Sequence, residues 1–316
     1  MKTADSETRS SNKIVGRIIV VKPKGSVLRA VNPSTGDVCA VIKTKKGWRP
    51  LKEENDIFNG AYTALSKTGE HVRYLIFPGG TIHFSLENIE AMKPGWNTDE
   101  QAIRLCERAA HDAVMGSIDA TMSKKLNEVA DFVSVGVDTV NSKRCPTSAE
   151  MVVVFSTKDR RVVGVTGKSY PIKEQEKTLL RVSDIQSHFM RVGGDRLLVL
   201  GCHDLNVFSP RVHANVGQGS NRATVIHEFI RLTKAFKPTV VLQHPHMTDS
   251  SHIWKQGWSG IRQQLPLVKV YASALRVHSG KNKSPLSAIR RCTASCQQLV
   301  VDILYDEIKP NGCRLL

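Results

Sequence analysis

The stretch from Arg196 to Arg211, RLLVLGCHDLNVFSPR, constrains the fold more than any other part of the chain. Four apolar residues, Leu197 to Leu200, are followed directly by a glycine. A short unbroken apolar run that ends at a small residue is typical of a strand buried on both faces, as in layered α/β domains. The polar residues Cys202, His203 and Asp204 come next, at the strand end where α/β folds hold their ligands. The run therefore predicts a buried strand that delivers a cysteine to a cleft.

Short apolar runs of the same kind recur along the chain, and segments with helical periodicity lie between several of them. The runs begin near residues 38, 74, 132, 151, 162, 197, 239, 269 and 299. The helical segments span residues 53–66, 102–115, 119–130, 224–235 and 254–264. Strands that alternate with helices pair in parallel, so the strand at 38–42, the helix at 53–66 and the strand at 74–77 predict a βαβ unit. The whole pattern predicts a layered α/β fold.

The spacing of these elements predicts one large domain, because the connections are too short to separate a second one. Residues 1–12 are polar and predict a disordered tail. Residues 13–37 predict an N-terminal strand extension, and the main domain is expected to span residues 38–316. The tail lacks the apolar segment of a secretory signal, and no apolar stretch reaches the ~18 residues that span a bilayer. We expect no membrane association.

Charge and cysteine content bear on partners and compartment. The formal net charge of +16 favours an anionic partner, which leaves nucleic acid, an acidic protein and an anionic substrate open. Aromatic residues make up only 6% of the chain, which argues against stacking platforms for single-stranded nucleic acid. Seven scattered cysteines without a CxxC pair are typical of reduced thiols rather than of a disulfide framework. A cytoplasmic location is therefore expected.

Three segments follow one another in an informative order. One strand leads into Lys168, the buried run described above leads into Cys202, and a later strand leads into a proline-containing loop ahead of Trp254 and Arg262. In this order and context, the segments resemble the carbon–nitrogen hydrolase superfamily, which contains nitrilases and aliphatic amidases. The resemblance covers roughly residues 38–306.

The resemblance implies a four-layer αββα sandwich, a homodimer or larger homo-oligomer, and no cofactor. It gives Cys202 the role of a nucleophile that attacks the carbon of a small-molecule amide or nitrile. Lys168 would lower the pKa of the thiol and steady the charge that develops on the substrate. Glu174 and Glu176, in the loop between these two residues, are the candidates for a second carboxylate that orients the lysine, and Glu174 is slightly favoured. The expected substrate-binding residues are His203, Asp204, His244 and His246.

The chain departs from the family at the residue that should be the general base. The strand that ends in Phe77-Pro78 is followed by Gly79, where the family carries glutamate. That carboxylate accepts the thiol proton, passes it to the leaving amine and activates water, and a glycine can do none of this. The candidates to replace it are His83, in the same loop, and His203, next to the nucleophile, since a histidine can act as a base at neutral pH.

Two functions therefore stay open. The first is a thiol-dependent amidase-like or nitrilase-like hydrolase with a displaced base. The second is a catalytically degenerate member of the same fold that acts as a binding or regulatory subunit for an acidic or nucleic-acid partner. A metal site built from His244, His246, Asp249 and His252 is disfavoured, because Pro245 bends the segment and no HxxxH helix supports it. No metal is expected.

Overall fold

The computed structural model describes residues 13–22, 27–31, 38–44, 47–50, 54–86, 92–140, 147–247, 250–278, 284–295, 298–306 and 313–316, and the fold is stated for these residues. Their strands form three sheets, and helices cover the two larger ones. The predicted tail, residues 1–12, lies outside the described residues.

The largest sheet contains nine of the described strands. They are β1 (Val15–Lys22), β5 (Val72–Ile76), β6 (Ile82–Phe84), β7 (Ala130–Thr139), β8 (Glu150–Ser156), β9 (Arg161–Gly167), β14 (Leu275–His278), β15 (Val300–Asp306) and β16 (Cys313–Leu315). Seven follow the order β16-β15-β1-β5-β7-β8-β9, with β14 beside β1 and β6 beside β7. β5 pairs in parallel with β1 and β7, whereas β8 runs antiparallel to β7 and β9. The carboxyl ends of β5, β7 and β9 therefore meet the amino end of β8 at one edge.

A second sheet has four of the described strands, β10 (Phe189–Val192), β11 (Asp195–Leu200), β12 (Val240–Gln243) and β13 (Val270–Ser273). β11, β12 and β13 are parallel, so the residues that follow them, beginning with Gly201, His244 and Ala274, lie at one edge. A small antiparallel sheet consists of β2 (Val27–Val31), β3 (Val38–Thr44) and β4 (Gly47–Pro50).

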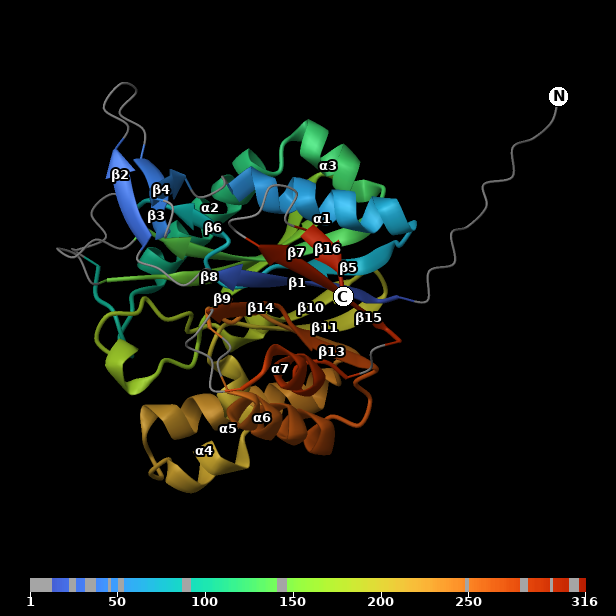
Figure 1. The fold of residues 1–316 in the computed structure, drawn as a ribbon. Coiled ribbons are helices and arrows are strands. Elements are labelled where there is room, and N and C mark those ends of the chain that lie inside the picture. Colours follow the sequence, from blue (N-terminus) through green and yellow to red (C-terminus); the bar gives the residue numbers. More distant parts are fainter. Residues whose placement is uncertain are drawn as a thin grey trace.

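Helices cover the outer face of each large sheet, so the molecule has four layers (Figure 1). On the nine-stranded sheet lie α1 (Glu54–Thr68), α2 (Glu100–Ser117) and α3 (Ala120–Asn127), and on the four-stranded sheet lie α5 (Asn221–Phe236) and α6 (Ser251–Gln264). The first helical layer packs around Phe58 and Val133, and the second packs around Trp258. A third core, with Val154 and Leu242, fills the space between the two sheets. The predicted four-layer αββα sandwich is confirmed.

Side chains of the expected capping type begin three of these helices. Asp99, Asp119 and Ser220 accept hydrogen bonds from backbone N–H groups in the first turns of α2, α3 and α5, at 2.9, 2.8 and 3.2 Å. Each bond satisfies one donor that the helix itself leaves without a partner. Two short helices, α4 (Pro210–Asn215) and α7 (Leu286–Cys292), complete the described α-helices, and three 3-10 turns span Lys173–Gln175, Ile185–His188 and Asp204–Phe208.

None of the described helices is both long and apolar enough to cross a bilayer. The longest of them, α2, has 18 residues and carries charged side chains such as Arg104 and Glu107 along its length.

The predicted βαβ unit is wrong in one of its strands. β5 pairs with β1, while β3 pairs with β2 and β4 in the small sheet. The reason is that an apolar run indicates a buried strand but not its neighbour. The predicted strand at 269–277 is likewise two strands, because the chain leaves the four-stranded sheet after β13 and β14 joins β1 in the large sheet. β1 itself lies inside the large sheet, between β15 and β5.

Candidate active site

Cys202 follows β11 and lies beside the end of β9. The residues Leu197 to Leu200 are all fully buried, as expected for a strand covered on both faces. The next residue is Gly201, and a Cβ on it would lie 3.1 Å from the Cα of Lys168. The glycine therefore lets the two strand ends approach closely. Cys202 is only 5% exposed, and its Sγ accepts the backbone N–H of His246 at 3.3 Å. The ends of the lysine strand and of the cysteine strand therefore converge.

Asp204 joins these two strand ends. Its carboxylate accepts the backbone N–H groups of Ser169, Tyr170 and Gly201 at 3.0, 2.7 and 2.9 Å. The side chain is fully buried, and this burial raises its pKa. Asp204 does not line the cavity beside the cysteine. Asp204 therefore does not lie where a substrate contact was predicted. Its carboxylate instead holds the loop after β9 against the turn after β11.

A buried series of hydrogen bonds holds the backbone of Cys202. Gln243 donates from Nε2 to the Cys202 carbonyl at 2.9 Å, and Ser273 donates from Oγ to Oε1 of Gln243 at 2.7 Å. Trp258 completes the series by donating from Nε1 to the Ser273 Oγ at 3.1 Å. These bonds tie the ends of β11, β12 and β13 to helix α6, so the position of the cysteine is fixed by three strands and a helix.

Lys168 is buried, and two side chains hold its ammonium group. Its Nζ lies 3.0 and 3.2 Å from the two carboxylate oxygens of Glu150 and 2.5 Å from Oε1 of Gln175. Gln175 also donates from Nε2 to Glu150 at 2.7 Å. The carboxylate beside the lysine is therefore that of Glu150 at the start of β8. Glu174, the predicted partner, is exposed, because the 3-10 turn Lys173–Gln175 directs Gln175 inward instead.

The imidazole of His246 lies between two carboxylates. Its Nε2 is 2.5 Å from Oδ2 of Asp138, and its Nδ1 is 3.3 Å from Oε2 of Glu150. Asp138 and Glu150 face each other across β7 and β8, so a single strand register supplies both. A ring nitrogen of His246, a Glu150 oxygen and the Sγ of Cys202 all lie within 4.8 Å of one another. A thiol, an imidazole and a carboxylate thus form one cluster.

The ring of His246 also fills the space beside Gly79. A Cβ on Gly79 would lie 2.6, 2.7 and 2.8 Å from the Cε1, Nε2 and Nδ1 of this ring. On the other side, Gly136 is so close that its own Cβ would lie 2.5 Å from the Cα of Gly79. The Gly79 N–H donates to the Pro245 carbonyl at 3.1 Å, so the two loops are in direct contact. A side chain at position 79 has no room while His246 occupies this site.

The charges of the cluster favour a thiolate beside an imidazolium. Burial alone would raise the pKa of the Cys202 thiol, but the positive charges of His203 and His246 outweigh burial and hold this pKa well below its ordinary value. Burial alone would lower the pKa of His246, but the negative charges of Asp138, Glu150 and Cys202 raise it well above its ordinary value. Burial would also raise the pKa of Glu150, and the neighbouring positive charges lower it.

The other predicted histidines lie in three different settings. His203 lines the cavity beside the cysteine. His244 is buried, with Nδ1 2.7 Å from the Phe77 carbonyl and Nε2 2.9 Å from Oγ of Ser134, and burial lowers its pKa to about 4. It is therefore a neutral residue that joins the sheets, and not the predicted substrate contact. His83 is exposed on β6 and does not line the cavity.

A cavity of about 590 Å³ opens beside the cluster. Cys202, His203 and His246 contribute to its wall, and α4 and α6 supply other lining side chains such as Val212 and Trp254. Its size and its mixture of apolar walls with a few polar groups are typical of a small-molecule site. The reactive cluster is therefore reachable by a small ligand.

One group of described residues has donor atoms close enough to hold a metal ion, namely Glu150, Cys202 and His246. Thiolate, imidazole and carboxylate donors together suit zinc. These donors are already engaged in ion pairs, however, since Lys168 binds Glu150 and a carboxylate binds each side of the imidazole. Asp249, from the disfavoured histidine set, lies outside the described residues.

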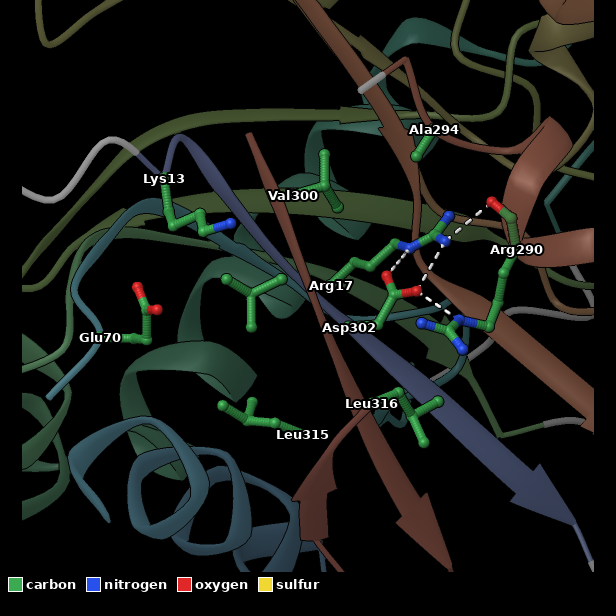
Figure 2. A pocket seen from close by; sticks show the side chains of 10 residues that line it. Lys13, Arg17, Glu70, Arg290, Ala294, Val300, Asp302, Leu315 and Leu316 are labelled. Carbon is green, nitrogen blue, oxygen red and sulfur yellow. Dashed lines mark hydrogen bonds and ion pairs between the residues drawn. The ribbon is translucent and has the colours of Figure 1, made fainter. Parts of the chain in front are cut away.

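A second cavity, of about 330 Å³, lies among β1, β15 and α7, with Lys13 on one side and the side chains of Arg17, Asp302 and Arg290 on the other (Figure 2). Arg17 is buried and binds Asp302 through Nε and Nη2, and Nε of Arg290 lies 2.5 Å from the same carboxylate. Burial would raise the pKa of Asp302, but the two arginines lower it. The cluster joins two strands to a helix, which is a structural role.

Comparisons with known proteins reveal likeness in structure only. No protein-family model matches the sequence, and no curated protein matches it. An amidase of the nitrilase superfamily from Nesterenkonia sp. AN1 is 11% identical with a TM-score of 0.46, and the match covers 87% of this chain and 80% of that one. A carbon–nitrogen hydrolase from Helicobacter pylori is 10% identical with a TM-score of 0.46, and the match covers 90% of this chain and 80% of that one.

Proposed function

We propose that the protein is a thiol-dependent hydrolase of C–N bonds in small amides or nitriles, with Cys202 as nucleophile and His246 as acid and base. The observation that carries this proposal is the cluster of Cys202 Sγ, a His246 ring nitrogen and a Glu150 oxygen within 4.8 Å, beside a cavity of about 590 Å³. A cysteine attacks as the thiolate, and an adjacent cation favours the thiolate. The pair therefore supplies an activated nucleophile without a glutamate at position 79.

The second part of the proposal is that the base has moved from one loop to the next. His246 occupies the space that a side chain on Gly79 would need, and in this proposal its imidazole takes over the role that the family resemblance assigns to a glutamate at that position. Asp138, 2.5 Å from Nε2, fixes the orientation of the ring, as an acidic residue does for a catalytic histidine in many hydrolases. We favour His246 over His83, because His83 is exposed on β6 and does not line the cavity.

In the first half-reaction, the Cys202 thiolate forms a bond to the amide carbon, and the carbonyl π electrons move to oxygen. The imidazolium of His246 then gives its Nδ1 proton, the one in the longer contact with Glu150, to the nitrogen, directly or through one water, as the C–N bond breaks, while Nε2 stays bound to Asp138. Ammonia or an amine leaves, a thioester remains on Cys202, and the imidazole is neutral. A nitrile carbon accepts the same attack and its nitrogen takes the proton, which gives a thioimidate on Cys202; addition of one water and loss of ammonia then convert the thioimidate to the thioester.

In the second half-reaction, the neutral imidazole takes a proton from water, and the water oxygen bonds to the thioester carbon. The C–S bond then breaks and its electron pair returns to Cys202 as thiolate. A carboxylic acid leaves, and His246 is again an imidazolium. The cycle restores the charge state that the neighbouring carboxylates favour in the resting site.

Lys168 and Glu150 have a positioning role in this proposal. Lys168 is 1% exposed, and Glu150 and Gln175 hold its ammonium group, so it faces a carboxylate and an amide rather than the cavity. The lysine keeps Glu150 ionised, and Glu150 in turn holds the imidazolium next to Cys202. Lys168 thereby acts on the thiol through two neighbours, which differs from the direct contact with substrate that the family resemblance implies.

The test combines turnover with trapping of the intermediate. Wild-type protein is incubated with a panel of short aliphatic amides and nitriles, and the intact protein is analysed by mass spectrometry after an acid quench. We expect an acyl adduct on Cys202 and release of ammonia. His246→Gln should lower turnover by about 10²–10⁴, the usual value of general acid–base catalysis. Cys292→Ser is the matched control, because burial raises the pKa of that thiol and it lies outside the cavity.

Two results would contradict the proposal. Turnover at the wild-type rate in Cys202→Ser would exclude this residue as nucleophile, and an unchanged rate in His246→Gln would exclude the imidazole as acid and base. Absence of both turnover and adduct across the panel would favour the alternative, a binding or regulatory subunit with the same fold.

A further inference from the structure

The cavity beside Cys202 is cationic. Two arginines, Arg211 and Arg222, line it, and no carboxylate is among the described residues that do so. The charges of Cys202 and His246, which also line it, balance each other within the reactive cluster. A surplus of positive charge on a cavity wall raises the local concentration of anionic ligands. The two arginines therefore indicate the charge of the substrate, provided that their own charges are not already balanced.

The charge of Arg222 is balanced. Its Nε lies 2.6 Å from a Glu176 carboxylate oxygen, and its Nη2 donates to the Pro171 carbonyl at 3.2 Å. Its guanidinium also lies over the ring of Tyr170, 5.4 Å from the centroid. These three contacts fix the side chain as part of the wall, so Arg222 is not free to pair with an anion.

Arg211 has no such partner. It lies at the start of α4, its side chain is exposed, and no ion pair binds it among the described residues. The amide of Asn215, one turn later, bonds the Arg211 backbone carbonyl at 2.7 Å and so stabilises this turn of the helix. Asn206 and Asn215 line the same cavity and add neutral hydrogen-bonding groups. An anionic group in the cavity would meet one uncompensated guanidinium.

The remainder of the wall is largely apolar. Val212, Val216 and Trp254 line it, and so do two large apolar side chains that are unusually exposed, Met247 at 47% and Ile253 at 45%. Exposed apolar side chains gathered around one cavity are typical of a ligand site rather than of ordinary surface. They suit a hydrocarbon segment that lies between the reacting carbon and the charged end of a ligand.

We infer that the substrate is an amide whose apolar acyl chain ends in a carboxylate, and that Arg211 binds this carboxylate. The inference rests on the proposed function, because it places the amide carbon at Cys202. The planar guanidinium can donate two parallel hydrogen bonds to a carboxylate, which a neutral amide of the same length cannot accept in the same way. Arg211 is thus a specificity residue for the acyl chain and takes no part in bond making.

The test compares substrates that differ only at the far end of the chain. Monoamides of linear dicarboxylic acids are paired with unbranched aliphatic amides of equal chain length, and kcat/KM is measured for each pair. We expect the wild type to prefer the charged member by about tenfold or more at the best chain length, the size of one hydrogen-bonded charge pair. Arg211→Gln should remove the preference through KM. Arg231→Gln is the control, because Arg231 is exposed on α5, pairs with Glu228 and lies outside the cavity.

The outcomes separate this inference from the proposed function. Turnover without preference for the charged amides, or a preference that Arg211→Gln retains, overturns the inference and leaves the hydrolase intact. If no amide is hydrolysed, the proposed function fails, and calorimetric titration with the corresponding dicarboxylates still decides the inference. Binding that weakens about tenfold in Arg211→Gln, and not in Arg231→Gln, upholds the anion site, whereas absence of binding to the wild type refutes it.

Discussion

Gly79→Ala is the perturbation that bears most directly on the moved base. The added methyl carbon would lie 2.6 Å from Cε1 of His246, and ordinary Cβ contacts begin at about 3.4 Å. The ring must therefore retreat by the difference, about 0.8 Å. Gly79 has no left-handed backbone conformation, so the alanine itself introduces no backbone strain. The three atoms nearest to the new methyl carbon all belong to the imidazole, so this contact is the main effect of the substitution.

The magnitude follows from what the ring would lose. A displacement of ~1 Å at a catalytic group typically lowers the rate by ~10²-fold. The same movement lengthens the contacts of the imidazole with Asp138 and Glu150, now 2.5 and 3.3 Å, so the pKa of His246 should fall and that of Cys202 should rise. Overpacking of a filled site costs about 1–3 kcal/mol of stability. We expect turnover to fall about a hundredfold in a protein that still folds.

The assay is the rate at which iodoacetamide alkylates Cys202, followed by mass spectrometry across a range of pH. In the wild type the rate should stay high below the ordinary thiol pKa, and in Gly79→Ala it should drop at acidic and neutral pH. Gly116→Ala in helix α2 is the matched control, because its Cβ would meet nothing within 4 Å. An unchanged alkylation profile in Gly79→Ala would refute the steric argument. So would a gain of turnover in Gly79→Glu, which places a larger side chain against the same ring.

Three further predictions concern stability and are measured by urea unfolding. Burial lowers the pKa of His244 to about 4 in the folded protein, so as the pH falls this imidazole is protonated first in the unfolded chain. The free energy of unfolding should therefore decrease by about 3 kcal/mol between about pH 6.5 and about pH 4. His244→Gln should flatten that slope, and an equal slope would show that other groups cause it. Asp302→Asn should cost about 3 kcal/mol, since it leaves Arg17 and Arg290 without their shared carboxylate, and a change below about 1 kcal/mol would contradict a structural role for this cluster. Asp204→Asn should cost about 1–3 kcal/mol, because an amide cannot accept all three backbone N–H groups that the carboxylate accepts, and a neutral effect would mean that these bonds contribute little.

The sequence contains the information for the strands that carry the chemistry. Leu197 to Leu200 is a continuous apolar run because both faces of β11 are covered, and the structure buries all four side chains. The same reasoning places Lys168 at the end of β9. Gly201 then allows these two ends to meet, because a Cβ at this residue would lie only 3.1 Å from the Cα of Lys168. Residues at the ends of buried strands can be found in this way because burial leaves a local signature in the sequence.

The partners of those residues leave no such signature. Asp138 and Glu150 face each other across β7 and β8, and this pairing depends on strand register, which an apolar pattern does not determine. Glu174 lies closer to Lys168 in the sequence, yet the 3-10 turn leaves it exposed and Gln175 makes the contact. Proximity along the chain therefore selects the wrong carboxylate when a neighbouring strand can supply one.

The position of His246 depends on still longer-range packing. The histidine and Gly79 are far apart in the chain, and they meet because the loops after β5 and β12 contact each other through the Gly79 N–H and the Pro245 carbonyl. The signal available in the sequence is the pair of a missing side chain at one strand end and a His-Pro-His segment at another. Interpreting the two together requires knowledge that these strand ends face each other across two sheets.

The most direct test of the thiolate–imidazolium pair is the ultraviolet absorbance of the thiolate as a function of pH, taken as the difference between wild type and Cys202→Ser. The wild type should retain its thiolate absorbance well below the ordinary thiol pKa of about 8.5, and His246→Gln should lose this acidic thiolate. A wild-type titration centred near the ordinary value, or an unchanged titration in His246→Gln, would contradict the account.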